Sequence, residues 1–241
     1  MKMIELHSLY KSLGGRPVLC GVDLQVERGE TLVIIGRSGC GKTVLLKHVI
    51  GLLRPDAGRI LINGVDITRL TGRELDHVRL KCGMLFQEAA LFDSLTVFEN
   101  VGFALREHTK MTRESIRARV QECLTLVGLD GTDDLYPEAL SGGMKKRVGL
   151  ARAIALSPEI LLYDEPTSGV DPVMGEEIHE LIQKLSEELG VTSLVVTHDW
   201  ESARRIGDRI ALLESGRIAA LGTPEELQVM GAPAVKEFFR L

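Results

Sequence analysis

The chain has 241 residues, of which 44% are hydrophobic and 26% are charged. This apolar share is ordinary for a globular protein, so it excludes a disordered chain and a collagen-like fibre. The 34 acidic and 29 basic residues give a net charge of −5, which does not favour a general nucleic-acid coat.

Cysteine spacing and the apolar runs bear on the cellular compartment. The four cysteines are widely spaced and form no Cys-x-x-Cys pair, so we expect free thiols and neither a disulfide framework nor a zinc site. No stretch approaches the ~20 apolar residues that span a bilayer, and residues 1–7 lack an apolar signal core. We therefore expect a cytoplasmic protein that reaches a membrane only through a partner.

The first third of the chain is expected to form strands around one helix. Three segments have strand patterns, the last of them continuously apolar as in a buried parallel strand: 17–19, 22–26 and 31–35. Residues 42–53 have a helical pattern that stops before Pro55. The Asn63-Gly64 pair predicts a hairpin between the apolar segments on either side of it.

The middle of the chain is helical, and strands return after it. Helices are expected at 97–107, 113–127 and 143–155. The elements expected afterwards are a strand at 160–163, a helix at 176–189, a strand at 191–197 and a hairpin over 210–219. Thr223 and Glu226 form a capping box around Pro224 and open a last helix. This order indicates an α/β sheet interrupted by a helical insertion.

A phosphate-binding loop follows the apolar strand at 31–35. Its residues match the Gly-x-x-x-x-Gly-Lys-Thr pattern and open a helix: Gly36, Arg37, Ser38, Gly39, Cys40, Gly41, Lys42 and Thr43. The glycines let the backbone wrap a phosphate, which free N–H groups and the helix dipole attract. Lys42 would neutralise β- and γ-phosphate charge, and Thr43 would bind Mg²⁺. The competing interpretation is a glycine-rich turn that happens to precede a helix.

Cys40 lies inside this loop, at the start of the expected helix. A helix N-terminus can lower the pKa of a thiol, which would fit a reactive sensor cysteine. The favoured interpretation is a small residue tolerated beside the phosphate.

Two carboxylates follow the apolar strand at 160–163. Ligands bind at the carboxyl ends of the strands in a parallel α/β sheet, so Asp164 is expected to face the Mg²⁺ held by Thr43. Glu165 is expected to orient and deprotonate the attacking water. Alone, such an acidic pair is weak evidence, but together with the phosphate loop it indicates phosphoryl transfer.

A second helix start also suits an anion. Ser141 and two glycines, Gly142 and Gly143, stand before the helix expected at 143–155. An isolated Ser-Gly-Gly is more often a capped helix with a flexible lead-in.

With this stretch included, essentially residues 2–225 resemble the ATP-binding-cassette (ABC) ATPase family, whose six motifs occur here in the family's order. The resemblance implies an α/β fold in which a P-loop NTPase, RecA-like core carries an N-terminal antiparallel β subdomain and an inserted α-helical subdomain. We expect a single domain over 1–241. Its parts are the core with the β subdomain at 1–87 and 157–222, the helical signature subdomain at 88–156 and a helical tail at 223–241.

The resemblance also implies roles for individual residues. In this family the signature of one subunit covers the γ-phosphate held by the other, so the segment 140–144 implies a homodimer that clamps two ATP molecules with Mg²⁺. Gln87 resembles the glutamine that senses Mg²⁺ and the attacking water, and residues 168–171 resemble the D-loop. His198 resembles the switch histidine that contacts the γ-phosphate.

Two positions depart from the family pattern. Leu13 stands where the family often has an aromatic ring stacked on adenine, and Tyr10 lies three residues earlier. Adenine is then held by Leu13, by Tyr10, or poorly. Val44 replaces a frequent Ser or Thr after the phosphate loop, and its expected effect is modest.

The segments 86–101, 143–148 and 163–169 are similar to the Mla/Mce-associated lipid-transport ATPases of bacteria. Amino-acid importers more often carry Gln where Met144 stands. This similarity implies an ATPase on the cytoplasmic face of the inner membrane, in a complex that moves phospholipids between inner and outer membranes and maintains outer-membrane lipid asymmetry. The implied partners are an integral-membrane permease, an Mce-domain substrate-binding protein and a small STAS-domain protein, with no nucleic acid.

Two surfaces keep alternative interpretations. Four apolar residues after Gln87 form either a groove for a helix of the permease or the core of the helical insertion: Leu91, Phe92, Leu95 and Phe98. The segment 235–241, with its paired aromatics, either docks on its own domain or contacts the partner ATPase.

Other functions are also open. The chain could serve an ABC importer or exporter for another substrate, such as an amino acid or an organic solvent. A nucleic-acid or ribosomal ABC ATPase is disfavoured because the chain has neither a long coiled-coil insertion nor a second cassette. A non-hydrolysing module is disfavoured by Glu165 and His198.

Overall fold

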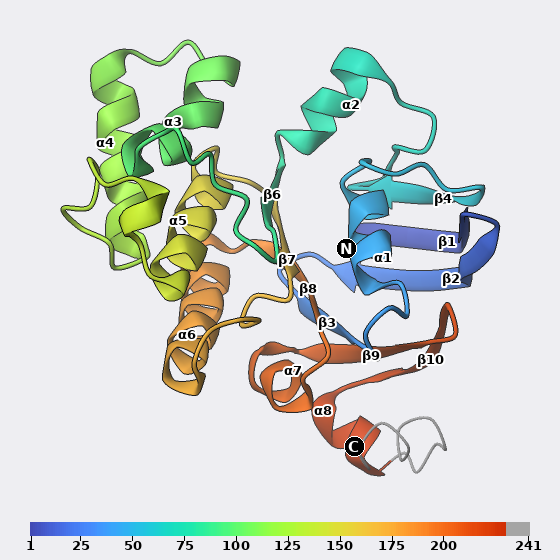
Figure 1. The fold of residues 1–241 in the computed structure, drawn as a ribbon. Helices are drawn as coiled ribbons and strands as arrows, with labels where there is room; N and C mark the ends of the chain where they lie inside the picture. The colour runs from blue at the N-terminus through green and yellow to red at the C-terminus, as the bar shows by residue number, and fades with distance from the viewer. Residues whose placement is uncertain (230–241) are drawn as a thin grey trace.

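The computed structural model describes residues 1–229, which form two β-sheets and a group of helices (Figure 1). The four-stranded sheet is antiparallel, with the order β2 (Arg16–Glu27), β1 (Lys2–Leu13), β4 (Ala57–Ile62) and β5 (Val65–Asp66). The six-stranded sheet has the order β10 (Arg217–Gly222), β9 (Arg209–Glu214), β3 (Thr31–Ile35), β8 (Thr192–Thr197), β7 (Ile160–Asp164) and β6 (Cys82–Leu85). The strands from β9 to β6 are parallel, so their carboxyl ends share one edge.

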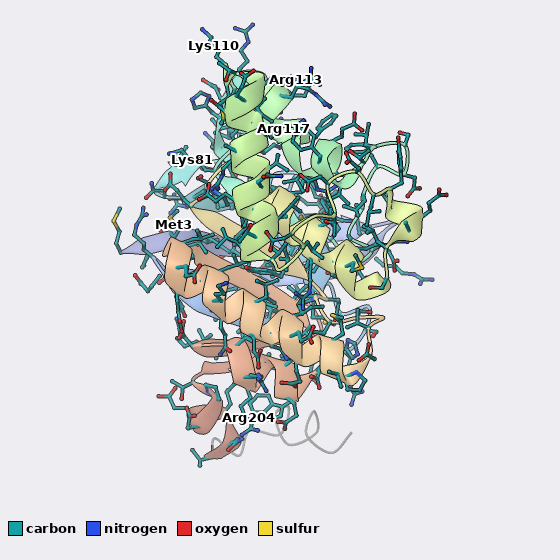
Figure 2. The ribbon with its side chains drawn as sticks, turned by 90° about the vertical axis from the view of Figure 1, so that its left-hand side faces the viewer. Met3, Lys81, Lys110, Arg113, Arg117 and Arg204 are labelled. Carbon is teal, nitrogen blue, oxygen red and sulfur yellow. The ribbon has the colours of Figure 1, made fainter. Side chains whose placement is uncertain are left out.

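The helices divide between the sheets and a separate group. In chain order they are α1 (Lys42–Val49), α2 (Gly72–Arg79), α3 (Val97–His108), α4 (Arg113–Leu126), α5 (Gly142–Ile154), α6 (Pro172–Leu189), α7 (Trp200–Ile206) and α8 (Pro224–Val229), with a 3₁₀ turn at Pro137–Ala139. Helices α3, α4 and α5 form a group on the side of the molecule away from the antiparallel sheet (Figure 1). The side view shows Lys110, Arg113 and Arg117 at the free end of this group (Figure 2).

The central parallel strands β3, β7 and β8 are buried on both faces. Alternate residues of β3 enter two cores: Leu32 and Ile34 pack toward the antiparallel sheet, and Val33 and Ile35 pack toward the helical group. Helix α1 lies between the two sheets and contacts β4 on one side and β7 and β8 on the other. Burial on both faces explains why these strands read as continuous apolar runs.

Several predictions from the sequence are confirmed, including the α/β class with an antiparallel sheet and inserted helices. The strand at 31–35 has the predicted bounds. At the predicted hairpin, Asn63 (φ 48°) and Gly64 (φ 77°) take the left-handed conformation that a two-residue turn requires. Thr223 and Glu226 form the capping box of α8.

Other predictions were wrong or incomplete. The helix expected to run to residue 53 ends at Val49. Gly51 takes the left-handed conformation (φ 68°), and the Lys47 carbonyl accepts the N–H groups of Leu52 and Leu53, which closes the end of the helix. The strands expected at 17–19 and 22–26 form one strand, β2. Helices α2 and α7 and strand β6 were not predicted; α2 buries only Leu75, which leaves almost no apolar pattern.

No helix within residues 1–229 is long and apolar enough to cross a membrane. The segment 235–241 lies outside the described residues.

Among the apolar residues after Gln87, Leu91 and Phe98 pack on the helical core. Phe92 is 46% exposed, and its ring centroid lies 5.0 Å from that of Phe103. This stretch therefore contributes both to the helical core and to the exposed surface.

Candidate active site

The loop at residues 36–41 joins β3 to α1 at the carboxyl edge of the parallel sheet. Gly36 is closely covered: a Cβ there would lie 2.5 Å from the Leu213 carbonyl oxygen. Gly41 caps α1 with φ 109°, and a Cβ on it would lie 2.9 Å from Val18 Cγ1. Both glycines are therefore required by close approach or backbone conformation, which a chance glycine-rich turn would not need.

Lys42 is buried with its ammonium inside the loop. Its Nζ donates to the carbonyl oxygen of Gly36 at 2.7 Å and to that of Arg37 at 3.3 Å. The same nitrogen lies 3.5 Å from Glu165 Oε1. The ammonium therefore connects the loop after β3 with the acidic pair after β7. Arg37 and Ser38 lie on the exposed side of the loop.

Thr43 and Asp164 meet between α1 and β7. The Thr43 hydroxyl donates to Asp164 Oδ1 at 2.9 Å. Asp164 is only 4% exposed, and burial raises the pKa of its carboxyl, an effect that the Thr43 hydrogen bond and the cations Lys47 and Lys42 oppose.

This pair fits Mg²⁺, which prefers oxygen ligands and usually keeps water and substrate phosphate in its shell. A hydroxyl and a carboxylate are oxygen donors already within contact of each other. Among residues 1–229 no cluster of three or more His, Cys, Asp or Glu could hold a metal alone. The donor set therefore suits a metal that arrives with a phosphate.

Replacing Asp164 with Asn is expected to stabilise the chain in the absence of nucleotide. Because the folded-state pKa is raised, folding favours the protonated carboxyl, and the ionised form costs stability above that pKa. The cost disappears as the pH falls below the unfolded pKa of about 3.9. Thermal unfolding at pH 7 should show a higher Tm for the variant than for the wild type, because a gain in the free energy of unfolding raises Tm.

The control for this prediction is Asp93→Asn, because Asp93 is exposed and carries no side-chain hydrogen bond within residues 1–229. The difference in Tm between Asp164→Asn and the wild type should become smaller as the pH falls toward about 4. A Tm difference that grows on acidification, or no Tm difference at neutral pH, would contradict a raised pKa of the Asp164 carboxyl.

Glu165 and His198 form the outer part of the site. The Glu165 backbone is left-handed (φ 47°), an unfavourable conformation for a non-glycine residue. Its Oε2 lies 2.9 Å from His198 Nδ1 and accepts the His198 backbone N–H at 3.3 Å. His198 itself is exposed at the end of β8. The carboxylate is thus held between Lys42 and His198.

Gln87 lies beyond the end of β6, next to β7 in the sheet. Its side chain is exposed, and its backbone carbonyl accepts a hydrogen bond from Lys146 Nζ at 2.5 Å. The same ammonium donates to the Glu165 carbonyl at 3.2 Å. Sequence reasoning missed Lys146; the only signal was its place in a basic stretch after two glycines.

Ser141 caps α5, and its hydroxyl accepts the Met144 N–H at 3.2 Å. Ser141 and Gly142 are exposed, whereas Gly143 is buried against Met174. Within residues 1–229 no hydrogen bond or ion pair joins these three residues to the loop at 36–43. One copy of the chain therefore does not bring the second anion-ready helix start onto its own phosphate loop.

The two residues considered for adenine contact lie on the same hairpin. Leu13, 41% exposed, and Tyr10, 45% exposed, lie on the β1–β2 hairpin, and the Tyr10 ring covers Gly21. Val18, which was not predicted to lie at the site, packs beside Gly41 of the phosphate loop. Val44 is half-buried in α1, where its carbonyl lies 2.7 Å from His48 Nδ1.

Cys40 is half-buried in the loop, where burial raises the pKa of its thiol. Lys42 opposes this shift without reversing it. A raised pKa leaves less thiolate, so the sensor hypothesis is disfavoured relative to a tolerated small residue.

Comparison with proteins of similar sequence identifies the family of this chain. The family model described as ABC transporter matches residues 19–168. The chain is 43% identical over 235 residues to the "Probable ribonucleotide transport ATP-binding protein mkl" of Mycobacterium leprae, covering 98% of this chain and 68% of that protein. It is 45% identical over 225 residues to the "Intermembrane phospholipid transport system ATP-binding protein MlaF" of Haemophilus influenzae, covering 93% and 85%.

A solved structure agrees with these sequences. The post-hydrolysis dimer of the ATP-binding cassette MJ0796, bound to ADP and Pi, is similar with a TM-score of 0.85 and 36% identity, covering 92% of this chain and 99% of that chain. The predicted resemblance and the ABC cassette fold, an antiparallel β subdomain beside a RecA-like sheet with helices, are thereby confirmed. The chain belongs to the ABC transporter family and is one of its ATP-hydrolysing, ATP-binding subunits.

Proposed function

We propose that this chain is the motor subunit of a bacterial ABC complex that moves phospholipids between the inner and outer membranes and so maintains outer-membrane lipid asymmetry. The observation that carries the motor assignment is the meeting of Lys42, Asp164 and Glu165 at one edge of the parallel sheet. The phospholipid assignment is supported by 45% identity to a relative named for intermembrane phospholipid transport.

The loop residues and their neighbours are proposed to bind the triphosphate. The N–H groups of residues 36–43 cradle the phosphates, and Lys42 exchanges its carbonyl contacts for phosphate oxygens. Thr43 and Asp164 would hold Mg²⁺, which neutralises β- and γ-phosphate charge when bound. Gln87 is proposed to approach the same metal and the attacking water from the neighbouring strand end.

Glu165 is proposed to be the general base. Its carboxylate accepts a proton from water as the water oxygen bonds to the γ-phosphorus and the bond to the bridging oxygen of ADP breaks. His198 holds that carboxylate from one side and is proposed to contact the γ-phosphate with its exposed ring.

The signature residues are proposed to act on the nucleotide of a second copy. Ser141 and Gly142 are exposed, and within residues 1–229 no hydrogen bond or ion pair joins them to the phosphate loop of the same chain. The dimer of the similar cassette MJ0796 supports a two-copy arrangement. We retain the division into a core with β subdomain at 1–87 and 157–222, a helical signature part at 88–156 and a tail at 223–241 as part of this proposal.

The proposed complex contains an integral-membrane permease, an Mce-domain substrate-binding protein and a STAS-domain protein, with this chain on the cytoplasmic face of the inner membrane. Ribonucleotides are the alternative substrate, because the mycobacterial relative is named for ribonucleotide transport. About two thirds of that relative's length is matched.

The experiment that tests the substrate is purification of the tagged chain from its native membrane, followed by identification of the co-purified proteins and lipids. We expect a permease and an Mce-domain protein, and ATP hydrolysis by the complex that rises in vesicles containing phospholipid. Stimulation by ribonucleotides or amino acids, with no effect of phospholipid, would overturn the phospholipid assignment and leave the motor assignment in place.

A further inference from the structure

Lys146 lies one turn inside α5, and its side chain is among the most buried charges of the chain, with 5% of the residue exposed. Its ammonium donates to the backbone carbonyls of Gln87, at 2.5 Å, and Glu165, at 3.2 Å. Within residues 1–229 no carboxylate comes within ion-pair distance of it. One cation therefore joins three separate segments of chain: α5, the loop after β6 and the loop after β7.

A buried ammonium is costly, so its presence needs a reason. Burial lowers the pKa of Lys146, and the fields of Glu88, Asp164 and Glu165 partly oppose this shift. Buried charges can often be replaced by apolar side chains of similar volume without loss of stability. Packing alone therefore does not account for a lysine here, while Lys145 beside it has no side-chain partner within residues 1–229.

Both segments that Lys146 joins have unusual backbones. Glu165 is left-handed (φ 47°), and its carbonyl also accepts the Ser168 N–H at 3.1 Å. After Gln87, the residues Ala89 (φ 57°) and Ala90 (φ 49°) are left-handed as well. Conformations of this kind persist only where their surroundings hold them.

A second cation of the same helix holds the loop after Gln87. Arg152 donates to the carbonyls of Ala89 and Ala90, each at 2.6 Å. Helix α5 therefore fixes this loop at two points, while Lys146 alone also reaches the backbone of Glu165. Beyond the paired ends of β6 and β7, Lys146 therefore links the backbone of Gln87 directly to that of Glu165.

We propose that Lys146 is a positioning residue for ATP hydrolysis: by tying the backbones of Gln87 and Glu165 to the signature helix, it sets the two side chains that order the attacking water. The inference rests on the proposed roles of these two residues.

The test compares Lys146→Met with Lys145→Met in the full chain, with Lys146→Arg as the conservative variant. Methionine keeps most of the length of the side chain but removes the ammonium donor from both carbonyls, so Gln87 loses this hydrogen bond and Glu165 keeps only the one from the Ser168 N–H. We expect Lys146→Met to lower kcat about 10- to 100-fold, the range that a misplacement of about 1 Å produces. The KM for ATP should stay within about threefold, as the phosphate loop is untouched.

Lys146→Arg should recover most of the kcat, because a guanidinium can donate to both carbonyls. Lys145→Met should hydrolyse ATP like the wild type. If Lys146→Met turns over like Lys145→Met, the inference is wrong. The inference is also wrong if the loss of kcat in Lys146→Met is explained by a lower Tm of the variant. It is equally wrong if Lys146→Arg does not restore kcat.

Glu165→Gln, assayed in parallel, separates this inference from the proposed function. If Glu165→Gln is inactive and Lys146→Met is fully active, the base assignment stands and only the positioning role fails. If both variants are fully active, both assignments fail.

Discussion

Glu165→Gln is expected to bind ATP with nearly wild-type affinity and to hydrolyse it about 10²–10⁴-fold more slowly, the range for loss of a general base. Glutamine keeps the size of the side chain and its acceptor oxygen, but it cannot take a proton. Because hydrolysis would reopen the dimer, the variant should accumulate as a nucleotide-bound dimer. Phosphate release and size-exclusion chromatography with ATP measure the two effects.

The matched control is Glu187→Gln, since Glu187 is an exposed glutamate of α6 with no side-chain partner within residues 1–229. It should retain normal turnover. Unchanged hydrolysis in Glu165→Gln would place the general base elsewhere, and the contacts of Glu165 with Lys42 and His198 would then be structural.

Lys42→Ala is expected to weaken ATP binding about 10- to 100-fold. Its ammonium is held in the loop by two backbone carbonyls and lies 3.5 Å from Glu165 Oε1, a position close to the expected phosphates. A charge-assisted hydrogen bond contributes about 1.5–3 kcal/mol, and ~1.4 kcal/mol corresponds to a tenfold change in Kd. Equilibrium titration with a fluorescent ATP analogue measures the loss.

Lys184→Ala, which alters an exposed lysine on α6, serves as the control and should bind ATP normally. The two variants also separate the proposed roles. Lys42→Ala should lose binding, and Glu165→Gln should lose only turnover. Wild-type ATP affinity in Lys42→Ala would refute the assignment of the loop at 36–43 to phosphate binding.

The parts of the site that the sequence predicted are those encoded locally. The strand, loop and helix around residues 31–49 follow from an apolar run, three glycines and a lysine within one short stretch. The acidic pair was found because it directly follows another apolar run. In both cases neighbouring residues specify the backbone, and the parallel sheet then brings the two strand ends together.

The parts that were missed depend on contacts between distant segments. Lys146 contacts a carbonyl 59 residues away, and the sequence around it says nothing of that partner. Val18 lies on β2, and its side chain packs against Gly41, the residue that caps α1. The left-handed backbone of Glu165 is likewise imposed by its surroundings, including its N–H bond to the Val196 carbonyl.

Two copies of the chain are proposed to enclose ATP between them, each presenting the start of α5 to the triphosphate held by the other. The most direct measurement is a structure of Glu165→Gln with MgATP. Ser141 and the N–H groups that follow it should lie within hydrogen-bond distance of a γ-phosphate on the loop of the second copy. A structure with ATP bound and Ser141 remote from the γ-phosphates of every neighbouring copy would contradict it.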